Sequence, residues 1–243
     1  MKILKFDVLA STNLYLKSLV KNTTVEDFTI INSVHQTHGK GQRGTNWTTQ
    51  PGKNLTFSVY KNHQNLAIEQ QFVLNKAVSL AIYQVLCDLN IPNLKIKWPN
   101  DIVSANQKIG GILIENTIQS KYITSSIIGI GLNVNQTSFD NLPQASSLKN
   151  ITGKTYNLDQ VLHSIIKELE VLLKYLEEGR FGVLHQKYLK ALYRLGLVST
   201  FQNINKHYFM GQIKTVDEQG LLVIALDSGK LKTFDLKQIK LMH

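Results

Sequence analysis

The sequence predicts an α+β protein: a mixed β-sheet with helices on one side, followed by a small β-module. Two segments with helical spacing, 68–90 and 157–179, alternate with β-rich runs. After Gly196 only short strands separated by turn signals follow. The 243 residues, 43% of them hydrophobic, suffice for one large core and a small satellite domain. We therefore expect two domains, residues 1–195 and residues 196–243.

Each expected element follows from a local pattern. A first helix is predicted where "STNLYLKSLV" begins with Ser11 and Thr12, which are both good N-cap residues. Segments 68–90 and 157–179 each carry a broad apolar face, and Gly179 can end the second helix. "VLHQKYLKALY" predicts one more helix. The expected strands are "FTIINSVHQ", "KNLTFSVY", "LKIKWPN", "KIGGILIENTI", "KYITSSIIGIGLNV", "STFQNI", "HYFMGQIKTVD", "GLLVIALD" and "KLKTFDL".

Composition narrows the class of protein. One cysteine, Cys87, excludes an internal disulfide framework. No window is apolar enough to cross a membrane, and the N-terminal residues lack a signal peptide, so we expect a cytoplasmic protein. The formal net charge of +10 favours an anionic partner such as nucleic acid, a phosphate-rich ligand or an acidic protein.

The loop "HGKGQRGTNW", residues 38–47, has three closely spaced glycines. Clustered glycine indicates unusual backbone angles or a close approach to a ligand. The loop lies between two expected strands, which argues against a nucleotide P-loop or a Rossmann turn, because both need a following helix. His35 and His38 are interpreted as loop histidines, and no metal site is predicted.

The segment 97–115 is the second candidate for chemistry. Pro99 should end a strand, so that a short hairpin returns at Lys108 and brings Asp101 near it. On spacing alone, an ordinary surface hairpin with a weak ion pair explains this equally well. The paired glycines Gly110 and Gly111, together with Gly129 and Gly131 in a later strand, favour a ligand channel with a backbone floor.

These motifs resemble the biotin protein ligases. "STN" at 11–13, Gln36, "GKGQRGTNW" at 39–47, "KWPND" at 97–101, "KIGG" at 108–111 and "GIGLNVN" at 129–135 occur in the order of that family. The resemblance covers essentially the whole chain. It implies a catalytic domain similar to class II aminoacyl-tRNA synthetases, the biotin–lipoate ligase fold, with an SH3-like C-terminal β-barrel.

The resemblance also implies the activity. Biotin and ATP, accompanied by Mg²⁺, form biotinyl-5′-AMP and pyrophosphate. A lysine of the biotin carboxyl carrier protein of acetyl-CoA carboxylase then receives the biotin. The glycine loop is expected to fold over the adenylate and keep water out.

The resemblance implies site residues at the positions of this sequence that match the family motifs. Lys108 should reach the biotin carboxylate and the α-phosphate, with Asp101 orienting it or helping to bind the metal-nucleotide, and Arg43 as a third catalytic residue. The expected biotin-binding residues are Ser11, Thr12, Asn13, Gln36, Gly39, Lys40, Gly41, Gln42, Lys108, Gly111 and Gly129. The expected ATP or adenylate contacts are Arg43, Trp47, Lys97, Asn100, Lys108 and Asn133.

The loop departs from the family pattern, because Lys40, Gln42 and Thr45 stand where arginines are frequent. Lys40 keeps the charge but lacks the planar guanidinium fork. Since "STN" begins at residue 11, no DNA-binding domain and no operator binding are expected. Exposed sheet edges could pair two chains as a homodimer.

Two other functions remain open. A lipoate–protein ligase shares the fold and the adenylation chemistry, although "KWPND" with "KIGG" favours biotin. A nucleic-acid-binding protein would use the basic charge, but the β-module lacks a row of exposed aromatics alternating with basic residues.

Overall fold

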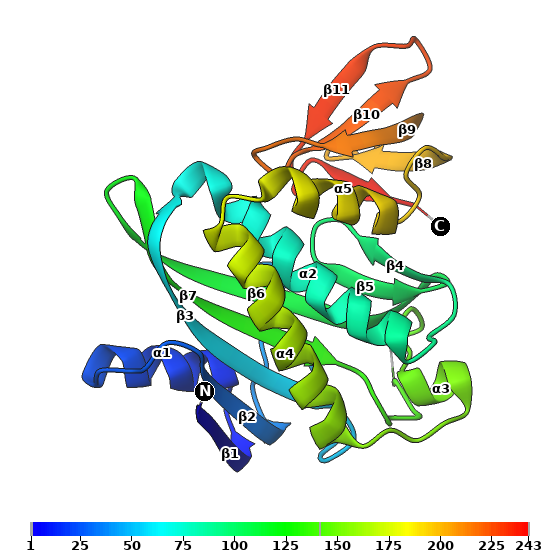
Figure 1. Ribbon diagram of the computed structural model, residues 1–243. Coiled ribbons are helices and arrows are strands. Elements are labelled where there is room, and N and C mark those ends of the chain that lie inside the picture. Colours follow the sequence, from blue (N-terminus) through cyan, green and yellow to red (C-terminus); the bar gives the residue numbers. More distant parts are fainter. Residues whose placement is uncertain (1, 141, 243) are drawn as a thin grey trace.

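The computed structural model describes residues 2–140 and 142–242, and within them all side chains except that of Arg43. A seven-stranded sheet has the order β1-β2-β3-β7-β6-β5-β4 (Figure 1). Its first pair, β1 with β2, is parallel and the other pairs are antiparallel, so the predicted mixed sheet is confirmed. The strands are β1 (Lys2–Leu9), β2 (Thr29–Gln36), β3 (Leu55–Ala67), β4 (Leu94–Lys97), β5 (Asp101–Ser104), β6 (Gln107–Gln119) and β7 (Tyr122–Leu132).

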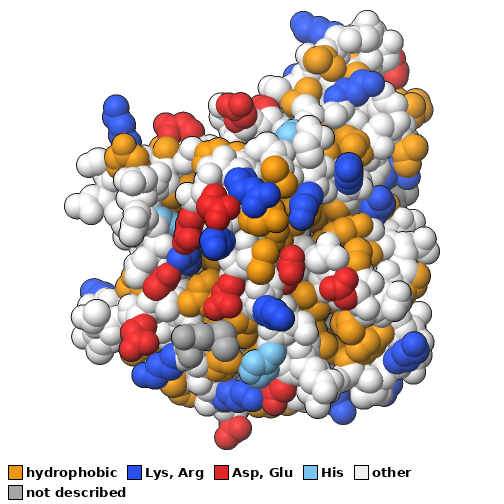
Figure 2. Space-filling model, in the orientation of Figure 1, with side chains coloured by type: hydrophobic (Ala, Val, Ile, Leu, Met, Phe, Trp, Pro, Cys, Tyr) orange, Lys and Arg blue, Asp and Glu red, His pale blue; other side chains and the backbone are white. Residues whose placement is uncertain are grey.

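The two long helices, α2 and α4, pack together across one face of this sheet (Figure 1). Both were predicted, and they bury their apolar sides in the main core with Phe57 and Val59 of β3. Figure 2 shows acidic and basic side chains interspersed over the exposed side of α4. The helices are α1 (Thr12–Asn22), α2 (Gln71–Asp88), α3 (Leu148–Thr152), α4 (Leu158–Glu177) and α5 (Phe181–Ala191), with short 3₁₀ turns η1 (Gln42–Gly44) and η2 (Ile68–Gln70).

Helix α1 lies on the opposite face of the sheet, so the expectation that all helices share one side was wrong. Leu16 of α1 packs against Ile31, Tyr60 and Ile127 in a second, smaller apolar cluster. The reason is the parallel β1–β2 pair, which needs a crossover, and α1 is that crossover. Alternation along β3 then sends Val59 into the main core and Tyr60 towards α1.

The C-terminal segment forms a separate antiparallel sheet of order β11-β10-β9-β8-β12, drawn in orange and red in Figure 1. Phe209 stacks between Phe201 and Phe234, with ring centroids 5.5 and 5.6 Å apart. None of the described helices is long and apolar enough to span a bilayer. The strands are β8 (Val198–Asn203), β9 (Tyr208–Val216), β10 (Leu222–Leu226), β11 (Leu231–Phe234) and β12 (Ile239–Leu241).

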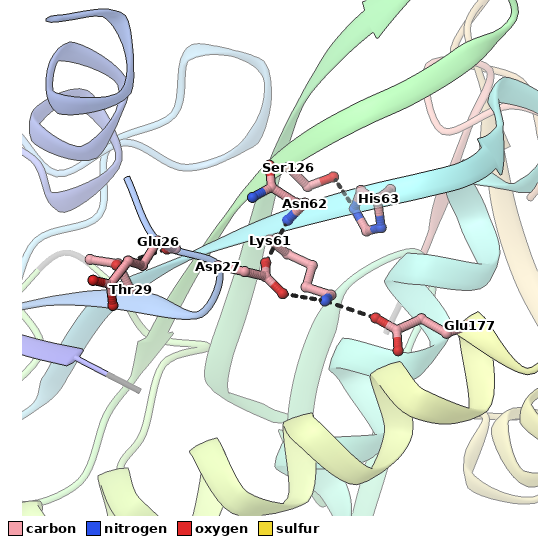
Figure 3. A network of polar contacts seen from close by, with 8 residues as sticks. All are labelled: Glu26, Asp27, Thr29, Lys61, Asn62, His63, Ser126 and Glu177. Carbon is pink, nitrogen blue, oxygen red and sulfur yellow. Dashed lines mark hydrogen bonds and ion pairs between the residues drawn. The ribbon is translucent and has the colours of Figure 1, made fainter. Parts of the chain in front are cut away.

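A buried lysine, Lys61, joins three elements on the face of the sheet that α2 and α4 cover (Figure 3). Its Nζ lies 2.6 Å from Asp27, in the turn before β2, and 2.8 Å from Glu177 at the end of α4. Burial lowers the pKa of Lys61, but the two carboxylates outweigh burial and raise it above its usual value. Beside it, Nε2 of His63 lies 2.9 Å from Oγ of Ser126. Burial lowers the pKa of His63 from 6.5 to about 4.

Candidate functional site

A cavity of about 360 Å³ is lined by residues of both sheets. This volume is in the range of small-ligand pockets. Most of the side chains and glycines that the sequence singled out meet in its wall. They are Ser11, Thr12, Asn13, Gln36, Lys40, Gly41, Gln42, Trp47, Lys97, Asn100, Asp101, Lys108, Gly111 and Gly129.

The polar end of the cavity is formed by the start of α1 and the end of β2. The backbone N–H of Thr12 donates to Oε1 of Gln36 at 2.7 Å, and the Thr12 hydroxyl donates to the same oxygen at 3.1 Å. Ser11, Thr12, Asn13 and Gln36 are all buried. Two donors on one oxygen fix the orientation of the Gln36 amide, so this end is preorganised.

Two further residues complete this polar network, and sequence reasoning missed both. Oγ of the fully buried Ser58 lies 2.6 Å from Oδ1 of Asn13, whose Nδ2 donates to Oε2 of Glu115 at 2.9 Å. No local pattern marks Ser58 or Glu115. They reach Asn13 only because β3 and β6 both pair with β7, which places Ser58 opposite Gly129.

Glycines of β7 form part of the floor, as the sequence predicted. A Cβ on Gly129 would overlap Oδ1 of Asn13, and a Cβ on Gly131 would overlap the indole of Trp47. Both positions therefore need glycine for a close approach. Within the described part of the chain, Nε1 of Trp47 is buried and has no hydrogen-bond partner. A buried donor without a partner costs about 1–3 kcal/mol, so this atom offers a contact for a ligand acceptor.

The predicted pair of Asp101 and Lys108 is present. Lys108 Nζ lies 2.6 Å from Oδ1 of Asp101 and 5.7 Å from the centroid of the Trp47 ring. β5 and β6 form the expected hairpin, with a register shift between Ile102 and Val103. Because the Lys108 and Asp101 side chains are 39% and 27% exposed, the pair is open to a ligand in the cavity.

The cavity is strongly cationic. Its wall carries four lysines and one aspartate, namely Lys40, Lys97, Lys108, Lys240 and Asp101. Lys240 comes from β12, a strand that the sequence analysis did not predict. Burial lowers the pKa of Lys97, and the lysines at 108 and 240 lower it further, whereas Asp101 raises it. Such a field favours an anionic ligand.

The glycine loop is folded into a tight hairpin in the structure. The N–H of Trp47 donates to the carbonyl of Gly39 at 2.9 Å, and the N–H of Gly41 donates to the carbonyl of Thr45 at 2.7 Å. These bonds bring Trp47 over the cavity floor. Gly39 itself does not line the cavity. The Arg43 side chain lies outside the described part of the structure.

Asn133 is also absent from the cavity wall. It is buried, and its Nδ2 donates to the carbonyl of Ser146 at 3.0 Å. The N–H of Ser146 in turn donates to the carbonyl of Lys108 at 2.9 Å, so Asn133 supports the backbone at Lys108. Asn100 lines the cavity while its Nδ2 donates to the carbonyl of Ile112.

Residues 2–140 and 142–242 contain no group of three or more His, Cys, Asp and Glu side chains placed to hold a metal ion. Of the two histidines interpreted as loop residues, His38 lies in the loop after β2, whereas His35 lies within β2, so the loop interpretation of His35 was wrong. Nδ1 of His38 lies 2.9 Å from the Thr37 hydroxyl, whereas Nδ1 of His35 is buried and makes no hydrogen bond to the described residues.

The chain is similar in sequence to known proteins. The sequence model described as the biotin/lipoate A/B protein ligase family matches residues 5–133. A curated relative, the bifunctional ligase/repressor BirA of Bacillus spizizenii, is 28% identical over 235 residues, which cover 94% of this chain and 70% of BirA.

Solved structures are similar over both sheets. The biotin protein ligase of Aquifex aeolicus, in complex with biotin and ATP, has a TM-score of 0.81 and 25% identity, covering 99% of this chain and 98% of its own. The biotin protein ligase of Leishmania major, in complex with biotinyl-5-AMP, has a TM-score of 0.66 and 19% identity, covering 96% and 98%. The predicted fold class is thereby confirmed.

Proposed function

Because the chain belongs to the biotin/lipoate A/B protein ligase family, we propose that it is an ATP-dependent biotin protein ligase. In the first step, the biotin carboxylate attacks the α-phosphorus of ATP, the bond to the β-phosphate oxygen breaks, and pyrophosphate leaves. In the second step, the amine of an acceptor lysine attacks the acyl carbon of biotinyl-5′-AMP, loses a proton and displaces AMP.

The observation that carries this proposal is the Lys108–Asp101 pair, 2.6 Å apart, in the wall of the cationic cavity. Adenylation brings a carboxylate and a phosphate together, and their repulsion must be offset. A cation about 4 Å from an anion is worth roughly 4 kcal/mol at an effective dielectric near 20. Asp101 holds the Lys108 ammonium in place until the anionic substrates arrive.

The two ends of the cavity suit the two substrates. Thr12, Asn13 and Gln36 supply hydrogen-bonding groups for the ureido ring of biotin, and apolar residues such as Ile112 and Leu113 pack on its thiophane ring and valeryl chain. We also assign Ser11, Gly39, Lys40, Gly41, Gln42, Lys108, Gly111 and Gly129 to biotin, and Arg43, Trp47, Lys97, Asn100, Lys108 and Asn133 to ATP.

The loop 38–47 would shield the intermediate. Trp47, held over the floor by its bond to Gly39, covers the cavity and limits attack by water on the mixed anhydride. Mg²⁺ enters with ATP as part of the substrate.

The acceptor is proposed to be the biotin carboxyl carrier protein of acetyl-CoA carboxylase. The excess of basic residues, +10 in formal charge, would attract an acidic acceptor and ATP, and no DNA binding is proposed.

The single cysteine suits a reducing cytoplasm. The division at residues 195 and 196 stays a prediction.

The test is exchange of labelled pyrophosphate into ATP, with biotin and with lipoate as parallel substrates, for the wild type and Lys108→Ala. We expect exchange with biotin only, and a loss of about a hundredfold or more in Lys108→Ala, because the lost charge stabilises the transition state. Lys121→Ala, an exposed lysine outside the cavity, is the matched control.

Exchange with lipoate instead of biotin would assign the chain to the lipoate branch of the family. Full biotin-dependent exchange in Lys108→Ala would refute the role given to Lys108.

A further inference from the structure

The turn between β4 and β5 is held by two hydrogen bonds from outside the first sheet. The indole N–H of Trp98 donates to the carbonyl of Gly220 at 2.9 Å, and the hydroxyl of Tyr188 donates to the carbonyl of Pro99 at 3.4 Å. Asp101 directly follows this turn as the first residue of β5. The position of the Asp101 carboxylate therefore depends on α5 and on the C-terminal sheet.

Gly220 reaches Trp98 because it lies directly against α2. Its φ is +87°, and a Cβ there would lie 2.5 Å from Cδ2 of Phe72. The Phe72 ring also meets Tyr188 edge to face, with centroids 5.9 Å apart. One aromatic ring thus supports both groups that hold the 98–100 turn.

One helical turn after Phe72 lies a buried ion, Lys76. Lys76 is only 3% exposed, and its Nζ lies 3.1 Å from Nδ1 of His185 on α5. Nε2 of His185 lies 3.4 Å from Oγ1 of Thr215 on β9. This chain of contacts joins α2, α5 and β9, just before the 217–220 turn that receives Trp98.

While Lys76 is charged, its contact with Nδ1 requires a neutral imidazole on His185. Burial lowers the pKa of Lys76, whereas the nearby carboxylates of Asp217 and Glu218 raise it. A buried ammonium needs an acceptor, and Nδ1 supplies one only if the imidazole is neutral. The ring proton then lies on Nε2, facing Thr215, an assignment that rests on this hydrogen-bond network. The charged groups that face the pair from the C-terminal sheet are Asp217 and Glu218.

We propose that Lys76 and His185 are positioning residues, which hold the 217–220 turn against α2 and through it hold Trp98 and Asp101 in the geometry of the site. The activity readout of this proposal rests on the proposed function, whereas its structural readout does not. The 217–220 turn then contributes to the geometry of the site, although none of its residues lines the cavity.

Acidification should break this link. Burial, and then the neighbouring Lys76 ammonium, lower the pKa of His185, whereas Glu218 raises it. At neutral pH the imidazole is neutral and the link is intact. As the pH falls through the lowered pKa, His185 loses its acceptor atom and becomes a second cation beside Lys76.

The activity test compares His185→Leu with His185→Gln. Leu leaves the Lys76 ammonium without an acceptor, and we expect kcat/KM for ATP in pyrophosphate exchange to fall about ten- to a hundredfold, as for a small misplacement of reacting groups. Gln restores an acceptor and cannot titrate, so it should keep most activity and weaken the acid limb of the pH profile. His163→Gln, on the exposed side of α4, is the matched control.

The structural test follows Trp98 fluorescence in a Trp47→Phe background, where Trp98 is the one remaining tryptophan. We expect a pH-dependent change in emission on acidification, which His185→Gln removes and His163→Gln keeps. His185→Leu should show the acid-like emission already at neutral pH.

Emission from Trp98 that is the same in all variants would overturn the proposal, whatever the activity. Equal kcat/KM in an active wild type and in His185→Leu would overturn it as well. Absence of exchange in the wild type would count against the proposed function alone, because the fluorescence result stands independently.

Discussion

Gly131 lies directly beneath the Trp47 indole, where a Cβ has no room. Gly131→Ala should therefore push Trp47 off the floor and cost about 1–3 kcal/mol as overpacking. We expect faster loss of bound biotinyl-5′-AMP and a change in Trp47 emission, measured by release of labelled adenylate and by fluorescence. Gly182→Ala on α5, where a Cβ meets nothing within 4 Å, is the control and should release adenylate as the wild type does.

At the scale of residues, the sequence was most informative where chemistry and backbone constraint coincide. Pro99 predicted the end of β4, and so the meeting of Asp101 with Lys108, which the structure confirms. Ser58 could not be found in this way, because its role depends on which strand lies next to β3. Asn133 as a nucleotide contact stays a prediction, since its amide binds the Ser146 carbonyl in the structure.

At the scale of elements, the Lys61 network ties β3 to α4 and to the turn before β2 (Figure 3). The helices α2 and α4 were predictable because their apolar faces are long and periodic. The strand β1 was missed because its residues are mostly exposed or half-buried, so that no clean alternation marks it. The strand β12 was missed because it has three residues.

The burial of His63, in β3, predicts how the free energy of unfolding depends on pH. Its pKa is 6.5 when unfolded and about 4 in the buried site. As the pH falls below 6.5, His63 becomes protonated in the unfolded chain but stays neutral in the folded chain. The free energy of unfolding therefore decreases until the pH reaches about 4. Urea unfolding of His63→Gln should show a smaller decrease over this window than the wild type. An identical decrease in both proteins would contradict the burial of a neutral His63, and His163→Gln should follow the wild type.

At the scale of the whole molecule, the two sheets share one cavity, since Lys240 of β12 faces the lysines of β4 and β6. Lys240→Met should raise the KM for ATP about three- to tenfold, and the effect should shrink at high salt, because it acts through a screened charge. Steady-state exchange kinetics at two salt concentrations measure this. Lys237→Met, an exposed lysine in the turn before β12 that does not line the cavity, should leave KM unchanged.

The antiparallel pairing of β3 with β7 joins distant parts of the chain, and it places Leu55 opposite Leu132. By contrast, β4 to β7 are consecutive and pair in sequence order. Contacts between distant residues form late, because closing the long loop between them costs entropy first. We therefore expect the β4–β7 meander to form before β3 pairs with β7. The cavity has walls on both sides of the β3–β7 pairing, so it is completed late in folding, and neither half of the sheet contains it by itself.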